Sequence, residues 1–442
     1  MNLPKKLDGG RRRVAVIGSG ISGLACAWLL SREHSVTLFE AAERLGGHSH
    51  TVEVELAGAR HPVDTGFLVF NRRTYPNLCA MFDLLGVGAV ESRMSFAVSL
   101  SEPDLEWAGS DLGTLFAQRR NLLRPAFFGM LRDLLRFNRE TTRIAMAASE
   151  GKAPLVTLGE YLERERYGAP FRDWYLLPMA ASIWSCPTRT MLDYPLATFL
   201  RFCHNHGLLQ IFDRPQWLTV RGGSREYVRR IAERLDDVRT GAPVLRVRRS
   251  AGGVWVNTAR ETESFDAVIF ACHSNQALEI LGEEASAAER AILGAVRYQD
   301  NLAVLHTDPA LLPRRRETWS AWNYLAGAGR ADSRPVSVSY LINHLQPLPS
   351  GTPVVVSLNP FLEPDPARVL QTLHYAHPVF DQGAIDAQAR LHEVQGVDRC
   401  WYAGAWTGYG FHEDGLRSAL AVVEALGVRV PWLSSPIETL AA

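Results

Sequence analysis

The order of apolar and polar blocks at the start of the chain predicts a strand, a helix and a second strand. The apolar run at residues 14–17 is short and β-branched, which is typical of a buried parallel strand. Residues 24–30 form a longer apolar stretch that predicts a helix, and residues 36–39 predict the second strand. No loop separates the first strand from the helix, so we expect a tight strand-to-helix turn in an α/β fold.

The pattern along the rest of the chain predicts further helices and strands. The helices are expected at residues 75–85, 156–167 and 227–235, with a last helix ending at residue 426. The strands are expected at residues 96–100, 105–107, 241–247, 253–256, 265–272, 302–306, 319–324, 336–342, 354–358 and 400–404. Thr157 and Glu160 have the spacing of a capping box at the start of their helix.

Residues 119–147 combine helical periodicity with a basic composition. Pro125 suits a helix start. The apolar side chains expected on one face are Phe127, Phe128, Leu131, Leu134 and Leu135, and the arginines expected on the other are Arg132, Arg136, Arg139 and Arg143. This pattern is typical of a helix that docks on a membrane surface or a partner helix, but on its own it favours a core helix with a solvated charged face. A lipid substrate would favour the membrane interpretation.

The first turn carries a candidate binding motif, because Gly18, Gly20 and Gly23 form G-x-G-x-x-G. Gly18 allows the tight turn, Gly20 lets a pyrophosphate approach the backbone, and Gly23 lets the helix pack on the strand. The helix N-terminus supplies N–H groups for phosphates. Glu40 follows the second strand, where an acid can accept hydrogen bonds from a ribose. The unit therefore predicts dinucleotide binding.

The residues after Glu40 sharpen the identity of the dinucleotide. Glu40, Arg44, Gly46 and Gly47 form E-x-x-x-R-x-G-G, which resembles the extension found in flavoprotein oxidoreductases of the amine-oxidase type. In that class the arginine and glycines wrap the FAD pyrophosphate, so the resemblance implies FAD as the cofactor. Residues 65–68 resemble the loop that passes beside the isoalloxazine, with a plain hairpin as the alternative.

Composition narrows the class of protein and its setting. At 442 residues the chain is long enough for two domains, and its 47% hydrophobic content fits a globular protein. Equal numbers of basic and acidic residues, 47 each, argue against a nucleic-acid partner. The six cysteines lack metal-site spacing, so we expect no metal. Without a signal peptide or membrane-spanning run, we expect a cytoplasmic protein, with docking at the inner membrane surface as a further expectation.

The whole chain resembles the FAD-containing, amine-oxidase-like proteins fused to plant cyclopropane fatty acid synthases, and their stand-alone bacterial relatives. The segments that carry the resemblance are residues 94–100, 182–187, 208–220, 319–323 and 408–416. The family implies a Rossmann-like FAD-binding domain interleaved with an α+β substrate domain. The FAD-binding domain is expected at residues 11–75, 215–286 and 396–428, the substrate domain at residues 76–214 and 287–395, and a C-terminal tail at residues 429–442.

The resemblance also implies the residues that bind the cofactor. They are Gly18, Gly20, Ile21, Ser22, Gly23, Glu40, Ala41, Arg44, Gly46, Gly47, His48, Thr65, Gly66, Phe67, Leu68, Val244, Ala271, Gly404, Gly415 and Leu416. Two departures from the wider amine-oxidase pattern stand out. Gly404 is followed by Ala405 where an aspartate is usual, and no lysine lies in residues 302–342, where many amine oxidases hold a water near the flavin.

These features predict an FAD-dependent oxidoreductase that desaturates or isomerises a fatty acyl chain of a phospholipid. Tyr409, His412 and Glu413 are the candidate catalytic residues because their segment lies beside the flavin in the family, while capping of the last helix is their alternative role. His204 is a weaker candidate. The alternatives are a flavin amine or polyene oxidase, and a non-catalytic flavoprotein that partners a cyclopropane synthase or methyltransferase. The expected partners are a fatty acyl or phospholipid substrate and a membrane surface contacted through residues 119–147.

Overall fold

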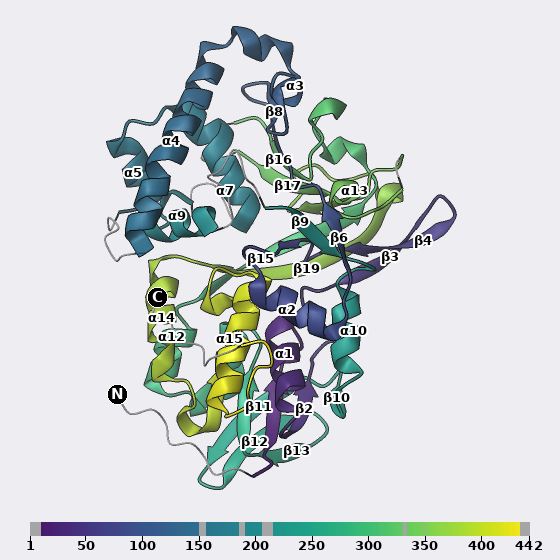
Figure 1. The fold of residues 1–442 in the computed structure, drawn as a ribbon, viewed down its shortest axis with the longest axis vertical. Coiled ribbons are helices and arrows are strands. Elements are labelled where there is room, and N and C mark those ends of the chain that lie inside the picture. The colour runs from purple at the N-terminus through teal and green to yellow at the C-terminus, as the bar shows by residue number, and fades with distance from the viewer. Residues whose placement is uncertain are drawn as a thin grey trace.

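The computed structural model describes residues 10–149, 156–184, 191–205, 215–329, 334–349 and 351–433. The molecule is elongated, with a parallel sheet and its helices in one half and a larger mixed sheet with a helical arm in the other (Figure 1). The predicted strand–helix–strand unit is confirmed as β1 (Arg13–Ile17), α1 (Ile21–Leu30) and β2 (Ser35–Phe39). The α/β fold class is therefore confirmed.

The parallel sheet collects strands from distant parts of the chain. Its order is β10 (Asp237–Arg239), β2, β1, β14 (Ala267–Phe270) and β20 (Cys400–Tyr402). All four pairings are parallel, so the carboxyl ends of the strands meet at one edge. In such sheets ligands bind outside that edge.

Both faces of the parallel sheet are covered, as its apolar strands require. One face packs on α1, α2 (Pro76–Leu85), α10 (Arg225–Ala232) and α15 (His412–Ala425). The other packs on α11 (Ser274–Leu281), α12 (Ala287–Leu293), α14 (Gln382–Arg390) and a small sheet of β11 (Val244–Ser250), β12 (Gly253–Thr258) and β13 (Thr262–Phe265).

The larger sheet has seven strands and forms the second half of the molecule. Its order is β19 (Val369–Val379), β15 (Arg297–His306), β18 (Val355–Leu358), β17 (Val336–Leu341), β16 (Trp322–Ala326), β7 (Phe96–Leu100) and β8 (Leu105–Ala108). The predicted β7–β8 pair is confirmed as antiparallel, and β16 runs parallel to β7. The sequence prediction missed β19, because its mixed polar pattern and Pro378 obscure a strand that is tolerated at a sheet edge.

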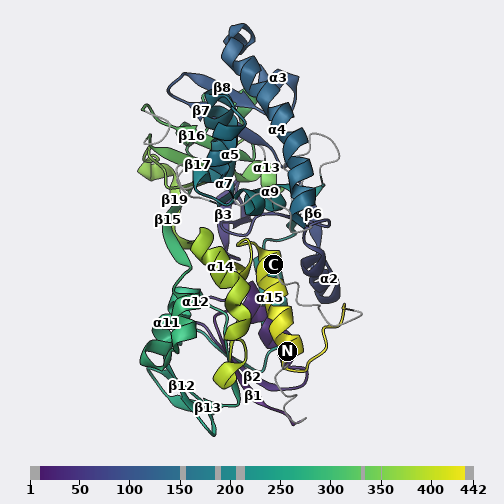
Figure 2. The ribbon, with the colours of Figure 1, turned by 90° about the vertical axis from the view of Figure 1, so that its left-hand side faces the viewer.

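Smaller elements complete the fold. Two small sheets pair β3 (Thr51–Leu56) with β4 (Ala59–Asp64), and β9 (Trp217–Val220) with β5 (Phe70–Asn71) and β6 (Ala89–Ser92). A helical arm comprises α3 (Leu112–Leu115), α4 (Pro125–Ser149), α5 (Leu158–Arg164), α6 (Ala169–Phe171), α7 (Leu177–Trp184) and α9 (Leu196–Asn205). Figure 2 shows this arm at the end of the molecule farthest from β12 and β13. The capping box of Thr157 and Glu160 is confirmed.

Helix α4 begins at Pro125 as predicted, but its two faces differ from the prediction. Phe127 and Phe137 are fully buried, whereas Phe128 and Leu135 are exposed, so the predicted apolar face is split between core and solvent. Arg136 is not a free surface charge either. Its guanidinium donates to the Glu165 carbonyl at 2.6 Å and lies 3.8 Å from the centre of the Tyr167 ring.

Some of the predicted features lie outside the described residues. They are residues 185–190 and 206–214, the only three lysines of the sequence (Lys5, Lys6 and Lys152), the tail from residue 434 onward and the side chain of His204. The domain boundaries remain a prediction, although α2 shares the core of the parallel sheet. No helix among the described residues is long and apolar enough to cross a membrane.

Candidate functional site

A cavity of about 1620 Å³ lies at the carboxyl edge of the parallel sheet and extends to the seven-stranded sheet. Most of the predicted cofactor residues line it, namely Gly18, Gly20, Ile21, Ser22, Glu40, Ala41, Arg44, Gly46, Gly47, His48, Thr65, Gly66, Phe67, Leu68, Val244, Ala271 and Gly404. The chain thus brings residues of β1, β2 and β11, and residues that follow β4, β14 and β20, to one space.

The turn between β1 and α1 is shaped by two glycines with different roles. A Cβ on Gly23 would lie 1.8 Å from the Gly18 carbonyl oxygen, so only glycine lets α1 pack on β1 there. A Cβ on Gly20 would meet no atom within 4 Å, because Gly20 faces the open cavity. Among the described residues no side chain caps α1, which leaves its first N–H groups available to an anionic ligand.

Glu40 is held rigidly at the end of β2. Its carboxylate accepts hydrogen bonds from the Ser19 backbone N–H at 2.9 Å, the Ser19 hydroxyl at 2.6 Å and the Ala42 N–H at 2.9 Å. Arg44 lies at the rim and donates to the Gly47 carbonyl at 2.9 Å, which fixes the loop of the second glycine pair. This arrangement can hold a ribose and a pyrophosphate side by side.

Three predicted cofactor residues support the cavity without lining it. Gly23 packs α1 on β1, as described above. The Gly415 carbonyl accepts a hydrogen bond from the Ser22 hydroxyl at 2.8 Å, which joins α15 to α1. Leu416 is fully buried in the core beneath them. The side chain of Leu416 therefore does not line the cavity, and its role in binding the cofactor stays a prediction.

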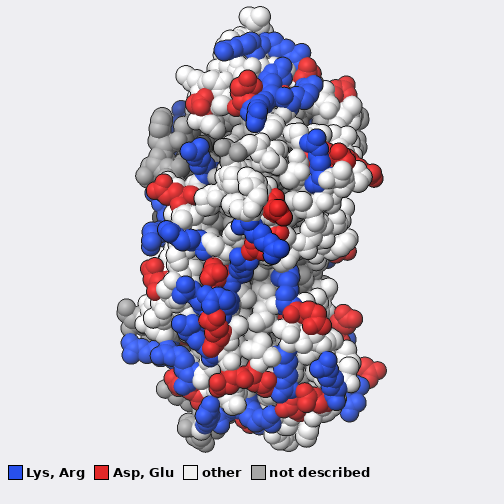
Figure 3. Space-filling view, turned by 90° about the vertical axis from the view of Figure 1, so that its right-hand side faces the viewer, with Lys and Arg blue, Asp and Glu red and all other residues white. Residues whose placement is uncertain are grey.

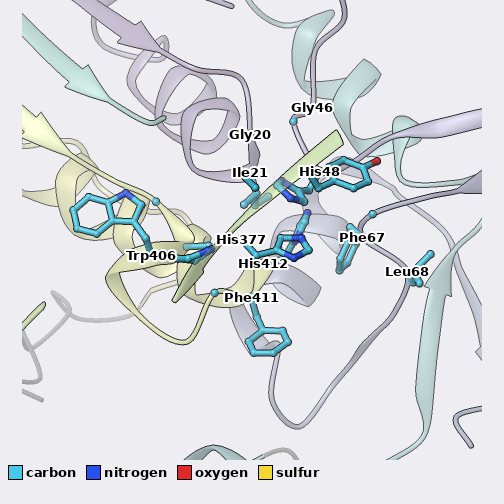
Figure 4. A pocket seen from close by; sticks show the side chains of 18 of the residues that line it. Gly20, Ile21, Gly46, His48, Phe67, Leu68, His377, Trp406, Phe411 and His412 are labelled. Carbon is cyan, nitrogen blue, oxygen red and sulfur yellow. The ribbon is translucent and has the colours of Figure 1, made fainter. Parts of the chain in front are cut away.

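Histidine and tyrosine rings gather in the middle of the cavity, where Figure 4 shows His48, His377 and His412 close together. The His48 ring centre lies 4.8 Å from that of Tyr375 and 5.3 Å from that of His377. Burial lowers the pKa of His273 and of His377 to about 4 and holds that of His48 well below its usual range. These imidazoles are neutral at physiological pH, so they act as hydrogen-bonding groups and not as cations.

The sequence prediction missed His273, Tyr375 and His377. Tyr375 and His377 are two residues apart on β19 and so share one face of the strand. Their spacing of two residues would have indicated a shared face, but only if residues 369–379 had been recognised as a strand. His273 follows β14 and stacks on Tyr298, with ring centres 4.4 Å apart.

The three candidate catalytic residues have different surroundings. Tyr409 and His412 line the cavity. The His412 ring stacks on Phe67 with centres 3.7 Å apart, and its Nε2 lies 2.9 Å from the Ser49 hydroxyl. Burial lowers the pKa of His412 to about 3, so it is a neutral and weakly basic group.

Glu413 does not line the cavity. Its carboxylate accepts from the Asn77 backbone and side-chain N–H groups at 3.0 and 2.7 Å and from the Leu78 N–H at 3.0 Å. These bonds satisfy the first N–H groups of α2. Glu413 therefore caps α2 and not the last helix, and its catalytic role stays a prediction that its position outside the cavity does not support.

The far end of the cavity is apolar and aromatic. Its walls include Phe96, Trp107, Tyr175, Met179, Ile183, Trp217, Trp322 and Tyr340. The aromatic-rich segment of residues 171–217 therefore contributes both to this wall and to the core, where Phe171 and Phe199 are fully buried.

The cavity fits a dinucleotide that carries a further ring system. The cradle at Gly20 is open, and four cavity-lining residues have a buried ring nitrogen without a hydrogen-bond partner among the described residues, namely His48 Nε2, Trp107 Nε1, Trp322 Nε1 and Trp406 Nε1. Buried polar atoms are normally paired, so such atoms indicate a missing ligand. The fold and the cavity together define a dinucleotide-dependent oxidoreductase in which a parallel sheet binds the cofactor and a second sheet faces it across the cavity.

Comparison with known proteins names the family. The model of the flavin containing amine oxidoreductases matches residues 21–298, which is more than half of the chain, and the protein belongs to this family. Its cofactor is FAD, as the residues at the start of the chain predicted. The protein is therefore an enzyme, a flavin-dependent oxidoreductase.

Individual relatives are distant. Carotenoid phi-ring synthase of Streptomyces griseus is 27% identical over 332 residues, which cover 70% of this chain and 60% of that protein. The same enzyme of Chlorobaculum tepidum is 28% identical over 182 residues, covering 39% of this chain and 24% of that protein. The chain thus spans less than two thirds of the length of these relatives.

Solved structures share the fold at low identity. The CLA-producing fatty acid isomerase from P. acnes is similar with a TM-score of 0.66 and 14% identity, covering 93% of this chain and 98% of that chain. Putrescine oxidase bound to putrescine gives a TM-score of 0.65 and 17% identity, covering 94% and 98%. At these identities the likeness concerns the fold alone.

Proposed function

We propose that this enzyme acts on a fatty acyl chain of a phospholipid, either oxidising it to introduce a double bond or isomerising a double bond already present. The observation that carries the proposal is the single cavity that joins the FAD cradle to an aromatic, apolar end. Its volume of about 1620 Å³ exceeds the ~300–1,000 Å³ of ordinary ligand pockets, which leaves room for a second ligand beside the cofactor.

The residues that line the apolar end of the cavity suit an uncharged chain. Phe96, Trp107, Met179, Ile183 and Trp322 present apolar surface that a methylene chain can cover while excluding water. No described residue that lines the cavity is a lysine, which argues against the water-holding lysine of many amine oxidases. The structurally similar fatty acid isomerase supports an acyl substrate on this fold.

The chain's own residues must take up a proton. When bound, FAD supplies an acceptor for the hydride that leaves one carbon of the substrate. Formation of the double bond then requires a group of the protein to remove a proton from the neighbouring carbon. The protein also orients the chain along the apolar wall and keeps water away from the reacting carbons.

A hydrogen-bonded chain leads from the cavity toward the surface and suits this proton transfer. The Tyr375 hydroxyl lies 2.9 Å from the Thr65 hydroxyl, which lies 2.9 Å from Nδ1 of the half-buried His50. Tyr375 and Thr65 both line the cavity. Burial raises the pKa of Tyr375 and lowers that of His50 to about 4, so Tyr375 relays the proton as a neutral hydroxyl and His50 Nδ1 is the final acceptor. His412, with its pKa lowered to about 3, is the second candidate acceptor.

The test is product analysis with the FAD-loaded enzyme. The enzyme is incubated with an artificial electron acceptor and phospholipids that carry saturated, monounsaturated or methyl-branched acyl chains, and the extracted chains are analysed by mass spectrometry. Loss of two hydrogens from one chain class, or a shifted double bond at unchanged mass, supports the proposal. Unchanged lipids together with turnover of putrescine would overturn it in favour of amine oxidation.

A second candidate substrate is a polyene, since the curated relatives at 27% and 28% identity are carotenoid phi-ring synthases. The same apolar wall would accept such a chain. Including a carotenoid in the assay separates the two, because a polyene substrate predicts turnover of the carotenoid and not of phospholipid. The non-catalytic partnership with a cyclopropane synthase or methyltransferase remains a prediction, and turnover of any lipid by the isolated enzyme would argue against it.

A further inference from the structure

The end of the helical arm carries an unusual surface, which we call the arm tip. Its exposed apolar residues are Leu112, Leu122, Leu123, Phe128 and Leu135, and its basic residues are Arg119, Arg124, Arg132 and Arg139. They come from α3, from the short helix at Arg119–Leu123 and from the outer face of α4. The surface therefore combines three consecutive segments of the chain at one end of the molecule (Figures 1 and 2).

The apolar side chains of the arm tip protrude into solvent. Leu123 is 86% exposed and Leu112 is 75% exposed, values that leave almost the whole side chain in water. Phe128 also contacts α3, because its ring centre lies 6.1 Å from that of Phe116. Single exposed leucines are ordinary, but five large apolar residues gathered on one end indicate a contact surface.

Charge and geometry identify the kind of contact. Phe128, Arg132, Leu135 and Arg139 follow each other at helical spacing on the outer face of α4, so apolar and basic groups alternate along one stripe. The Arg132 side chain is 79% exposed. Figure 3 shows basic side chains at this end of the molecule, with acidic side chains and uncharged surface among them. Arginine beside protruding leucine fits the boundary between anionic head groups and acyl chains.

The acidic residues of the arm tip form hydrogen bonds or ion pairs with other groups of the protein. Asp111 accepts a hydrogen bond from the Thr114 N–H at 2.8 Å and caps α3. Asp133 is buried, accepts from the Gly168 N–H at 2.9 Å and forms an ion pair with Arg132 at 3.3 Å. Asp104 forms ion pairs with Arg120 and Arg314. Arg119, Arg124 and Arg139 therefore give the surface its positive sign.

The arm tip is also close to the substrate end of the cavity. Gly109 and Trp107 line the cavity at and just beyond the end of β8. Three residues of extended chain span at most about 11 Å, so Leu112 lies within that distance of Gly109. A lipid leaving a bilayer at the arm tip would meet the apolar wall of the cavity after a short path.

We propose that the arm tip docks the enzyme on a phospholipid bilayer that contains anionic head groups. Leu112, Leu122, Leu123, Phe128 and Leu135 enter the acyl region, and the arginines bind the head groups. The inference deepens the proposed function by naming how a phospholipid reaches the cavity, but docking itself needs no turnover.

The test is binding of the FAD-loaded full chain to vesicles of phosphatidylcholine with a minority of phosphatidylglycerol, measured by co-sedimentation. Leu112→Glu and Leu123→Glu are each expected to lower vesicle affinity at least about ten-fold, since each removes an apolar side chain that becomes buried when the protein docks on the bilayer. Leu84→Glu is the matched control, because Leu84 is 54% exposed on α2 in the other half of the molecule. Its vesicle affinity should equal that of the wild type.

The charges are tested separately. Arg132→Glu and Arg139→Glu should each weaken binding about five-fold and reduce its dependence on salt, whereas Arg32→Glu, far from the arm tip, should not. Equal binding by the leucine variants and the wild type would overturn the proposal. So would a dimer in lipid-free solution that the same substitutions abolish, since it would assign the surface to a second copy. Turnover of detergent-dispersed phospholipid by the leucine variants tests the proposed function independently.

Discussion

The two ends of the cavity are built by different means. The FAD end is made of backbone: a strand-to-helix turn, two glycine pairs and the uncapped start of α1, all within residues 13–47. The apolar end is made of side chains that arrive from β7, β8, α7, β16 and β17. Backbone geometry tolerates few alternatives, whereas a wall of side chains can be altered one residue at a time. The cofactor is therefore fixed by a short local pattern, and the substrate by the whole arrangement of the second sheet.

The largest effect is expected at the backbone end. Gly20→Val places a side chain in the open cradle, so the enzyme should lose FAD while the unfolding temperature of the cofactor-free protein stays near that of the wild type. Gly23→Ala forces a contact with the Gly18 carbonyl and should destabilise the cofactor-free protein itself by about 1–3 kcal/mol. Flavin absorbance and thermal unfolding separate the two. Normal FAD content in Gly20→Val would refute a backbone cradle at this turn.

A smaller effect is expected where the two ends meet. Tyr375→Phe removes the hydroxyl that begins the chain to Thr65 and His50, and should lower kcat about 100-fold with little change in KM. Tyr298→Phe is the matched control, because its hydroxyl instead accepts from the Ser274 N–H at 2.9 Å. Rate measurements across pH check both variants. An unchanged kcat in Tyr375→Phe would contradict this role and favour His412 as the proton acceptor.

At the apolar end a single substitution should act on the substrate alone. Trp322→Ala removes an aromatic wall residue that packs edge-on against Tyr340, with ring centres 5.4 Å apart. We expect kcat/KM for the acyl substrate to fall about ten-fold with FAD content unchanged. Trp255→Ala, at an exposed site on β12, provides the control. A loss of flavin in Trp322→Ala would show that the two ends are not separable.

The smallest effect is expected outside the cavity. Glu413→Gln keeps the shape of the side chain but cannot accept all the N–H groups at the start of α2, so the protein should lose about 1–2 kcal/mol of stability. Burial raises the pKa of Glu413, so its contribution to stability is greatest at low pH and is lost as pH rises. Chemical unfolding across pH should therefore show a flatter profile in the variant. A large loss of kcat at full FAD content would restore a catalytic role.

The same contrast explains what the sequence alone could and could not predict. Gly18, Gly20, Gly23 and Glu40 lie close together in the chain, and their spacing is dictated by local backbone geometry, so the cofactor and the strand–helix–strand unit were predictable. The pairing of His48 with Tyr375 depends on β19, whose pattern does not read as a strand. The exposed positions of Phe128 and Leu135 depend on which face of α4 packs on α6 and α9. Helical periodicity defines two faces but not which one is buried.

One measurement tests the central claim most directly, namely that FAD and an acyl chain share this cavity. The FAD-loaded enzyme is mixed anaerobically with phospholipid, and the flavin absorbance is followed through a single turnover without any added acceptor. A desaturase predicts that an unsaturated or methyl-branched acyl chain bleaches the flavin, with one double bond gained per flavin reduced. A flavin that stays oxidised while the lipid remains unchanged, yet is bleached by putrescine, would contradict the account.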